Sequence, residues 1–342
     1  MLANGDAIAR LRRLLAAARE VAKDALLVPR LIESTGLSRQ GVELGLARYL
    51  EHDATDDEVA ALVRGVMPAT SVHVILSANV FTAPLRALAV ACAASSRVSV
   101  HPSRRDPVLT CALVENASDL GLVLTDATDV RAIESGEIHV YGRDETVLAV
   151  KGAAHADVRV RGHGAGMGVA LVDANVAVEM AAHAIADDVV AFDQRGCCSP
   201  RVVFALGGRA KELAEALSRR LRAMEERVPR GKLDESERRE SVRYRETMAF
   251  AGEVLEGAAH AVGVSRQGST CLVPPVGRHV HVVPVASVED ARAWLRPIER
   301  FVVLVGCSDE RLGRELALAS HVRLSPLGRM QRLPFDGPVD LR

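Results

Sequence analysis

The spacing of hydrophobic residues changes along the chain, from a helical repeat to a strand-like repeat. Up to about Val66, apolar residues recur at three- and four-residue steps, which is typical of amphipathic helices. There Thr55 and Glu58 form the capping-box pattern that begins a helix. From residue 71 the pattern becomes β-branched and alternating: SVHVILSAN predicts a strand, TAPLRALAVACAAS a helix and RVSVHPS a second strand. A β-α-β unit with such short connections predicts a parallel strand pair.

Strand and helix patterns continue to alternate to about residue 175, which predicts an α/β layered domain. A helix is then expected over 176–187 and a long charged helical region over 209–256, interrupted at Pro229 and Gly231. The later strands are expected in the stretches PRVVFALG, HAVGVSRQ, STCLV, HVHVVPV and FVVLVGC. The tail is loop-rich. We expect a domain boundary just before Cys197.

Composition narrows the class of protein. The chain has 342 residues and 49% hydrophobic content, enough for a large core and about two domains. The 43 Lys and Arg nearly balance the 44 Asp and Glu, and aromatics are only 3%, so nucleic-acid binding is not expected. No apolar run approaches the roughly 18 residues of a membrane span. The N-terminus has no signal-peptide pattern and the six cysteines form no disulfide framework, so we expect a cytoplasmic protein.

Two adjacent cysteines stand out in the stretch AFDQRGCCSPRVVF. A structural zinc site needs four ligands at recurring short spacings, so no metal is expected, and a disulfide between neighbours is strained. If this segment is strand-like, Cys197 and Cys198 point to opposite sides. They are then either two buried small hydrophobes or a nucleophile with a packing neighbour. The positive charge of Arg195 is one candidate for the group that lowers the pKa of a thiol here and favours its thiolate form.

Other polar and glycine positions mark strand ends. Asn79 follows the first predicted strand, where parallel sheets bind ligands, although a turn role explains it as well. His101 and Ser103 lie at the end of the next predicted strand. They either contact a nucleotide or belong to a strand end exposed to solvent. The run GHGAGMG does not satisfy G-x-G-x-x-G, and a tight turn between strands accounts for it equally well.

Taken together, Asn79, the HPS at 101–103, the glycine turn near residue 162 and DQRGCCSP resemble the aldehyde dehydrogenase superfamily. The resemblance is to its acyl-CoA reductase branch, which includes the fatty acid reductase that supplies aldehyde to bacterial luciferase. The stretches LVPRLIESTGLSRQGV and RLSPLGRMQRLPFDG support it, so it extends over about residues 25–337. It implies an α/β fold with a Rossmann-type cofactor domain and an α/β catalytic domain.

The resemblance also assigns roles. Cys197 aligns with the family nucleophile and Asn79 with the asparagine that forms the oxyanion hole. His101 and Ser103 stand where the family has Lys-x-Ser beside the cofactor adenosine, and Gly142 and Gly162 fall at turns that border the cofactor cleft. The implied division is 1–194 for the N-terminal helices and the cofactor-binding domain, 195–310 for the catalytic domain, and 311–342 for a segment returning to the cofactor domain or cleft.

The implied reaction is NAD(P)H-dependent reduction of an acyl-CoA thioester to an aldehyde through an acyl-cysteine, with NADPH slightly favoured over NADH and no metal. The chain departs from aldehyde-oxidising relatives: VALVDANVAVEMAAHA lacks their Glu-Leu-Gly-Gly and PPVGRHVHVV lacks the glutamate that holds the nicotinamide ribose. Loss of the water-activating base fits a reductase. Alternatives are a reductase of an acyl-phosphate or carrier-bound acyl group and a catalytically silent assembly subunit. A homo-oligomer, or a subunit of a fatty acid reductase-like complex, is expected.

Overall fold

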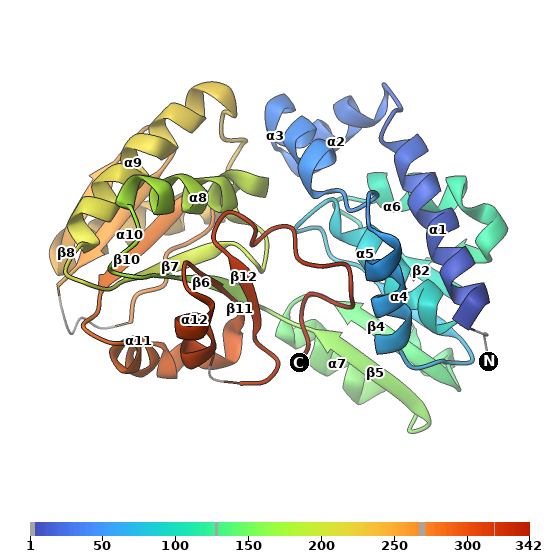
Figure 1. Cartoon of the computed structure of the whole chain (residues 1–342). Helices are drawn as coiled ribbons and strands as arrows, with labels where there is room; N and C mark the ends of the chain where they lie inside the picture. The colour runs from blue at the N-terminus through green and yellow to red at the C-terminus, as the bar shows by residue number, and fades with distance from the viewer. Residues whose placement is uncertain (1–3, 127–128, 267–270, 318) are drawn as a thin grey trace.

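The computed structural model describes residues 4–126, 129–266, 271–317 and 319–342. Its strands form two sheets that lie side by side, each covered by helices (Figure 1). The first sheet has five parallel strands in the order β3-β2-β1-β4-β5. Their bounds are β1 Val72–Ile75, β2 Val98–His101, β3 Leu122–Leu124, β4 Gly136–Tyr141 and β5 Val158–His163.

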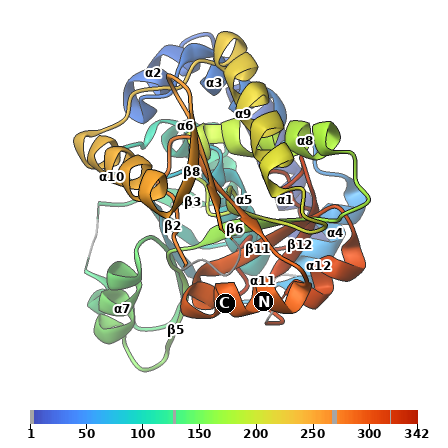
Figure 2. The same ribbon diagram turned by 90° about the vertical axis from the view of Figure 1, so that its left-hand side faces the viewer.

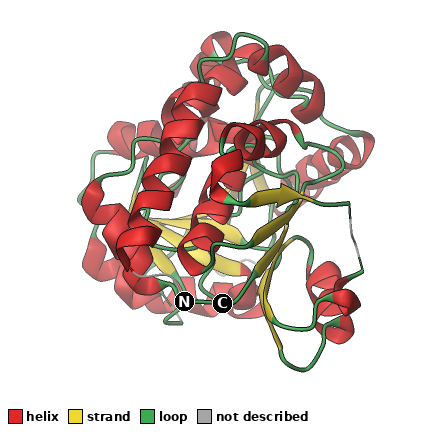
Figure 3. Ribbon diagram, turned by 90° about the vertical axis from the view of Figure 1, so that its right-hand side faces the viewer, coloured by secondary structure: helices red, strands yellow, loops and turns green. Residues whose placement is uncertain are grey.

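Helices of the N-terminal half stack over this sheet (Figure 3). They are α1 Asn4–Val21, α2 Leu27–Thr35, α3 Arg39–Leu44, which continues into a π-helical turn Gly45–Tyr49, α4 Asp56–Gly65, α5 Ala83–Ala94, α6 Val108–Asn116 and α7 Asp144–Ala153. The capping box predicted for α4 is present, because Thr55 accepts from the Glu58 N–H and Glu58 accepts from the Thr55 N–H. Helix α5 is rich in alanine and is buried from Pro84 to Ala94, so it packs closely between the sheet and α1.

The second sheet has seven strands in the order β12-β11-β6-β7-β10-β9-β8, parallel except for the β8–β9 pair. Its strands are β6 Met167–Val172, β7 Pro200–Ala205, β8 Gly252–Glu256, β9 Ala261–Ser265, β10 His279–Pro284, β11 Val302–Cys307 and β12 Arg323–Pro326. Helices α8 and α9 cover one face, and α11 and α12 the other (Figure 2). The helices are α8 Val178–Val190, α9 Ala210–Arg227, α10 Glu235–Ala251, α11 Val288–Leu295 and α12 Glu310–Leu316.

Most predicted elements are present, and the β-α-β unit is parallel as expected. Two local predictions are wrong. Residues 252–256, expected to be helical, form the edge strand β8, and the described part of STCLV has no strand. The tail is loop-rich as expected, apart from the short strand β12. The remainder of STCLV, like that of HAVGVSRQ, lies outside the described residues. β8 takes its hydrogen bonds from β9, a partner that periodicity within the segment cannot reveal.

The change of sheet falls earlier than the boundary expected before residue 195. β5 ends at His163 in the first sheet, and β6 begins at Met167 in the second. Helix α8 also packs on the second sheet, so residues 167–194 belong with the second half. The tail after β12 runs back to the first half, where Arg86 of α5 donates to the carbonyl oxygens of Leu333, Pro334 and Gly337. No helix of the described part has the length and apolar character to cross a membrane.

Candidate active site

A cavity of about 170 Å³ lies where the two halves meet. The first half contributes the loop after β1 and the end of β4, the second half contributes the turn at residues 196–198, and the tail contributes residues 330–340. β1 lies between β2 and β4, so the strand order reverses at the carboxyl ends that open into this cavity. Such a switch point is where open parallel sheets bind ligands.

Cys197 and Cys198 both line this cavity, Cys197 half-buried and Cys198 buried. They lie in a turn, and β7 begins only at Pro200, so strand alternation does not separate their side chains. That premise of the sequence argument is wrong. Burial still distinguishes the two residues, because Cys198 is a buried member of a hydrophobic cluster with Met330 and Leu333, whereas Cys197 is only partly buried against that cluster.

The two thiols differ in acidity because they contact each other. A hydrogen bond from the Cys198 thiol stabilises a thiolate on Cys197 and lowers the pKa of Cys197 below its ordinary value, against the opposing effect of burial. The same contact raises the pKa of Cys198, and burial raises it further. By contrast, burial raises the pKa of Cys92, inside α5, to about 11. Cys197 is therefore the thiol best suited to be a nucleophile.

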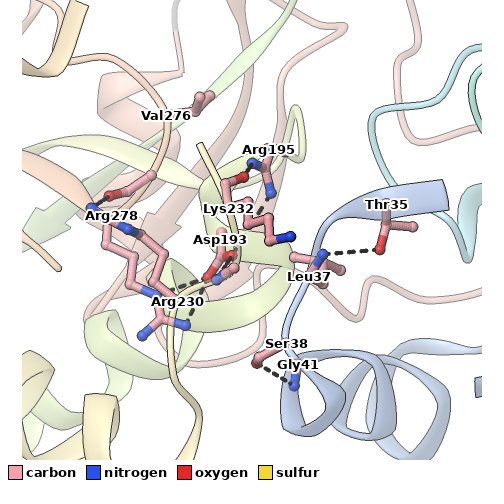
Figure 4. Close-up of polar contacts among 12 residues, drawn as sticks. Thr35, Leu37, Ser38, Gly41, Asp193, Arg195, Arg230, Lys232, Val276 and Arg278 are labelled. Carbon is pink, nitrogen blue, oxygen red and sulfur yellow. Dashed lines mark hydrogen bonds and ion pairs between the residues drawn. The ribbon is translucent and has the colours of Figure 1, made fainter. Parts of the chain in front are cut away.

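The loop before the cysteines has an unusual backbone. Phe192, Asp193 and Gln194 all have positive φ, at 53°, 50° and 65°, a conformation that non-glycine residues adopt at a cost. Arg278 opposes this cost: its Nε and Nη2 donate to Asp193 Oδ1 at 3.0 and 2.7 Å, and both side chains are almost fully buried (Figure 4). The Gly231 N–H donates to Asp193 Oδ2 at 2.8 Å.

Gln194 ties the same loop to the neighbouring strands. Its Nε2 donates to the carbonyl oxygens of Pro200 and His279 at 2.8 and 2.7 Å, and its Oε1 accepts from the His279 N–H at 2.8 Å. Arg195, considered above as a source of field for a thiolate, instead pairs with Glu237 of α10 at 2.9 Å (Figure 4 shows its position). Contacts with β7, β10 and α10 thus hold the loop in place.

Asn79 lies in the bend after β1 and lines the same cavity as Cys197. Its amide makes no hydrogen bond to any residue that the structure describes, and the backbone N–H of Cys197 makes none to another such residue. The two groups are available to a ligand oxygen. Asn79 and Cys197 are 118 residues apart in sequence (197 − 79), and the fold brings them to one cavity.

The predicted cofactor residues divide into two groups. Gly142 lines the cavity, beside Tyr141. Gly162 borders the adjacent hollow, and a Cβ there would lie 2.2 Å from Val147 Cγ1, so close packing of α7 requires this glycine. His101 and Ser103, at the end of β2, do not line the cavity: His101 Nδ1 lies 3.1 Å from the Thr125 carbonyl oxygen, and Ser103 accepts from the Arg105 N–H at 3.3 Å.

Sequence reasoning missed several lining residues. Both carboxylates that line the cavity among the described residues are ion-paired, Glu51 with Arg86 and Asp340 with Arg342. His163 of β5 stacks on Tyr141 with ring centroids 4.5 Å apart. Burial lowers the pKa of His163 to about 4. Glu51 and Arg86 are 35 positions apart, and Tyr141 and His163 are 22 apart (163 − 141), so no local motif marks these two pairs.

Comparisons with known proteins agree with this geometry. The family model described as acyl-CoA reductase (LuxC) matches residues 42–342. The chain belongs to this family. It is therefore an aldehyde-forming oxidoreductase that reduces acyl groups, as the sequence motifs predicted. No curated protein matches the reductase in sequence.

Solved structures resemble the reductase in fold. An NAD-dependent benzaldehyde dehydrogenase from Corynebacterium glutamicum is 14% identical, with 95% of this chain and 82% of that one covered and a TM-score of 0.72. A Mycobacterium tuberculosis aldehyde dehydrogenase complexed with NAD+ is 16% identical, with 93% and 77% covered and a TM-score of 0.73. An oxidoreductase from Marinobacter aquaeolei is 12% identical, with 95% and 78% covered and a TM-score of 0.75. The expected aldehyde dehydrogenase-like fold is confirmed.

Proposed function

We propose that Cys197 is the nucleophile with which the reductase converts an acyl-CoA thioester to an aldehyde. The observation that carries this proposal is the cavity in which a thiol of lowered pKa and a free amide face the same space. The Cys197 thiolate adds to the thioester carbonyl, the bond between the acyl carbon and the CoA sulfur breaks, and CoA leaves as a thiolate that takes up a proton. The acyl group is then a thioester of Cys197.

Asn79 stabilises the charge that develops on the carbonyl oxygen. Each addition to the carbonyl carbon produces an oxyanion, and the Asn79 amide and the Cys197 N–H are two donors at the cavity that make no hydrogen bond to another described residue. A fixed donor of this kind contributes about 3 kcal/mol at the transition state.

The cavity also favours reduction of the acyl group over hydrolysis. A hydrolase needs a free base to activate water, but Glu51 and Asp340 are both held in ion pairs. No carboxylate of the described lining is therefore free to activate water against the acyl-cysteine. When a hydride adds to its carbonyl carbon, the resulting tetrahedral alkoxide collapses by breaking the bond to the Cys197 sulfur, which releases the aldehyde and the Cys197 thiolate.

A nicotinamide dinucleotide supplies that hydride when it is bound. The switch point between β1 and β4 is shaped for such a cofactor, and Gly142 lets the backbone border the space beside Cys197. We propose NADPH, because Arg104 and Arg105 are exposed just beyond the end of β2 and would attract the additional phosphate. The ratio of kcat/KM for NADPH and NADH tests this preference.

All six cysteines are free thiols, which supports a reducing compartment such as the cytoplasm. A homo-oligomer, or assembly into a fatty acid reductase-like complex, stays a prediction of the resemblance. Size-exclusion chromatography with light scattering tests it.

The central experiment compares two adjacent substitutions. Cys197→Ala should abolish aldehyde formation from acyl-CoA, whereas Cys198→Ala should retain measurable turnover at alkaline pH. Full activity of the Cys197 variant would refute the proposal. Parallel assays with acyl-phosphate and carrier-bound acyl donors separate the related reductases. A folded wild-type protein that neither forms an acyl-enzyme nor binds cofactor would indicate the silent subunit.

A further inference from the structure

Three segments of the chain meet at Gly196, the residue before the nucleophile. A Cβ at Gly196 would lie 3.0 Å from Gln331 Oε1 of the tail and 3.4 Å from Val80 Cγ2 of the loop after β1. Val80 follows Asn79 directly, and Cys197 follows Gly196. The end of the Gln331 side chain therefore lies beside both segments that carry the donors described above, and Gln331 lines the cavity with them.

The Gln331 amide has no hydrogen-bond partner among the described residues. Its Nε2 is covered by neighbouring atoms and still has no acceptor there. A buried donor without an acceptor is costly, and native proteins keep few of them. A ligand oxygen as its partner explains why this one is kept beside a reactive cysteine. Rotation about the last side-chain bond exchanges Nε2 and Oε1, so the donor can face the cavity without breaking a hydrogen bond to a described residue.

The turn that carries Gln331 is held from the second half of the molecule. Asp188 of α8 is 1% exposed, and its carboxylate accepts hydrogen bonds from the N–H groups of Gly328 and Met330 at 2.6 and 2.9 Å. Gln331 follows Met330 directly. The backbone beside the Gln331 side chain is therefore fixed, and stabilisation of a developing charge depends on donors that are already in place.

The reaction forms an oxyanion in this part of the cavity twice. The Cys197 thiolate first adds to the thioester carbonyl, and a hydride later adds to the acyl-cysteine. Each addition moves an electron pair onto the carbonyl oxygen. The Asn79 amide and the Cys197 N–H supply two donors, and an oxyanion has a further lone pair for a third.

We propose that the side-chain amide of Gln331 is a third oxyanion donor of the reductase and hence a further catalytic residue. The inference rests on the proposed role of Cys197, because the oxyanion forms on the carbonyl that this sulfur attacks. It gives the tail, which comes from the far end of the chain, a direct part in the chemistry.

The test compares two reactions of the same sulfur in the full-length protein. Acylation of Cys197 passes through an oxyanion; it is followed by intact-mass spectrometry without cofactor, using octanoyl-CoA or tetradecanoyl-CoA, whichever acylates the wild type faster. Alkylation by iodoacetamide displaces iodide at a saturated carbon and forms no oxyanion. Gln331→Met should slow acylation about tenfold or more and leave alkylation within about twofold of the wild-type rate. In steady state the loss should appear in kcat, with little change in KM.

A matched control and a second variant accompany this measurement. Gln40→Met makes the same substitution at an exposed position of α3 that does not line the cavity, so both rates should be unchanged. Gln331→Glu keeps the size of the side chain and replaces the donor by an acceptor. It should lower the ratio of the acylation rate to the alkylation rate at least as much as Gln331→Met does.

A second substrate shows which part of the thioester is involved. The S-ethyl thioester of the same acyl group has the reacting carbonyl and no CoA arm. A donor to the oxyanion acts on both substrates, so the loss in Gln331→Met should be as large with the S-ethyl thioester as with the CoA thioester.

Every outcome decides for or against the inference. An unchanged ratio of acylation to alkylation in Gln331→Met would overturn it and leave the role of Cys197 intact. A loss confined to the CoA thioester would also overturn it, because the amide would then bind the CoA arm, and so would equal losses of acylation and alkylation. If Gln331→Met does not fold, Gln331→Glu decides. Acylation of the wild type at a residue other than Cys197 would instead refute the proposed function.

Discussion

The Asp193–Arg278 pair offers a sharp test of how the nucleophile loop is held. In Arg278→Met, Asp193 loses two hydrogen bonds and its nearest ion-pair partner while remaining 2% exposed, with Arg195 Nη1 left 3.7 Å from Asp193 Oδ2. Removing one partner of a buried ion pair costs about 3–5 kcal/mol. Three successive residues of positive φ add a cost of about 1 kcal/mol or more each, which the anchor no longer opposes.

The assay is a double-mutant cycle of Arg278→Met, Asp193→Asn and the double variant, measured by urea unfolding. Asparagine tolerates positive φ and keeps the acceptor for the Gly231 N–H. The double variant has no carboxylate at position 193 that could lose its contact with Arg278, so it should be more stable than the sum of the single effects predicts, by about 2–3 kcal/mol.

Alkylation of Cys197 by iodoacetamide reports on the site in the same variants. The rate should fall in Arg278→Met and recover partly in Arg278→Lys, which keeps the charge but not the two-point contact. Arg314→Met, at an exposed helical ion pair, is the control and should leave both stability and alkylation almost unchanged. Single effects that add within about 0.5 kcal/mol would show that the two side chains do not act as a unit.

Three further predictions follow from the geometry. Asn79→Ala should lower kcat about a hundredfold with little change in KM, because the amide acts on the oxyanion; an unchanged kcat in steady-state assays would exclude that role. Cys198→Ala should move the pH at which Cys197 becomes alkylated upward, since the thiol that lowers its pKa is lost; a downward or absent shift counts against the thiol contact. Burial lowers the pKa of both His279 and His281 to about 4, below the unfolded value of about 6.5, so the stability they retain at neutral pH should be lost as pH falls from 6.5 towards 4. Thermal unfolding between these pH values checks this, and a flat profile would contradict it.

Periodicity predicted the parallel β-α-β units because burial of one face of a helix or strand imposes its period on the sequence. It failed at β8, whose pairing with β9 is not encoded within 252–256. It also failed at the cysteine turn, where three positive φ values end the regular pattern before β7. Family motifs identified Cys197 and Asn79 as site residues, and these two residues do line one cavity.

Motifs could not reveal what surrounds the nucleophile. Asp193 is held by Arg278, 85 positions later, and Arg86 by carbonyl oxygens about 250 positions later. Every residue has a backbone carbonyl oxygen, so no sequence motif predicts which of these oxygens accept hydrogen bonds from Arg86. Local motifs therefore mark the residues that react, whereas the contacts that hold the nucleophile loop and the cavity around it depend on packing between distant segments.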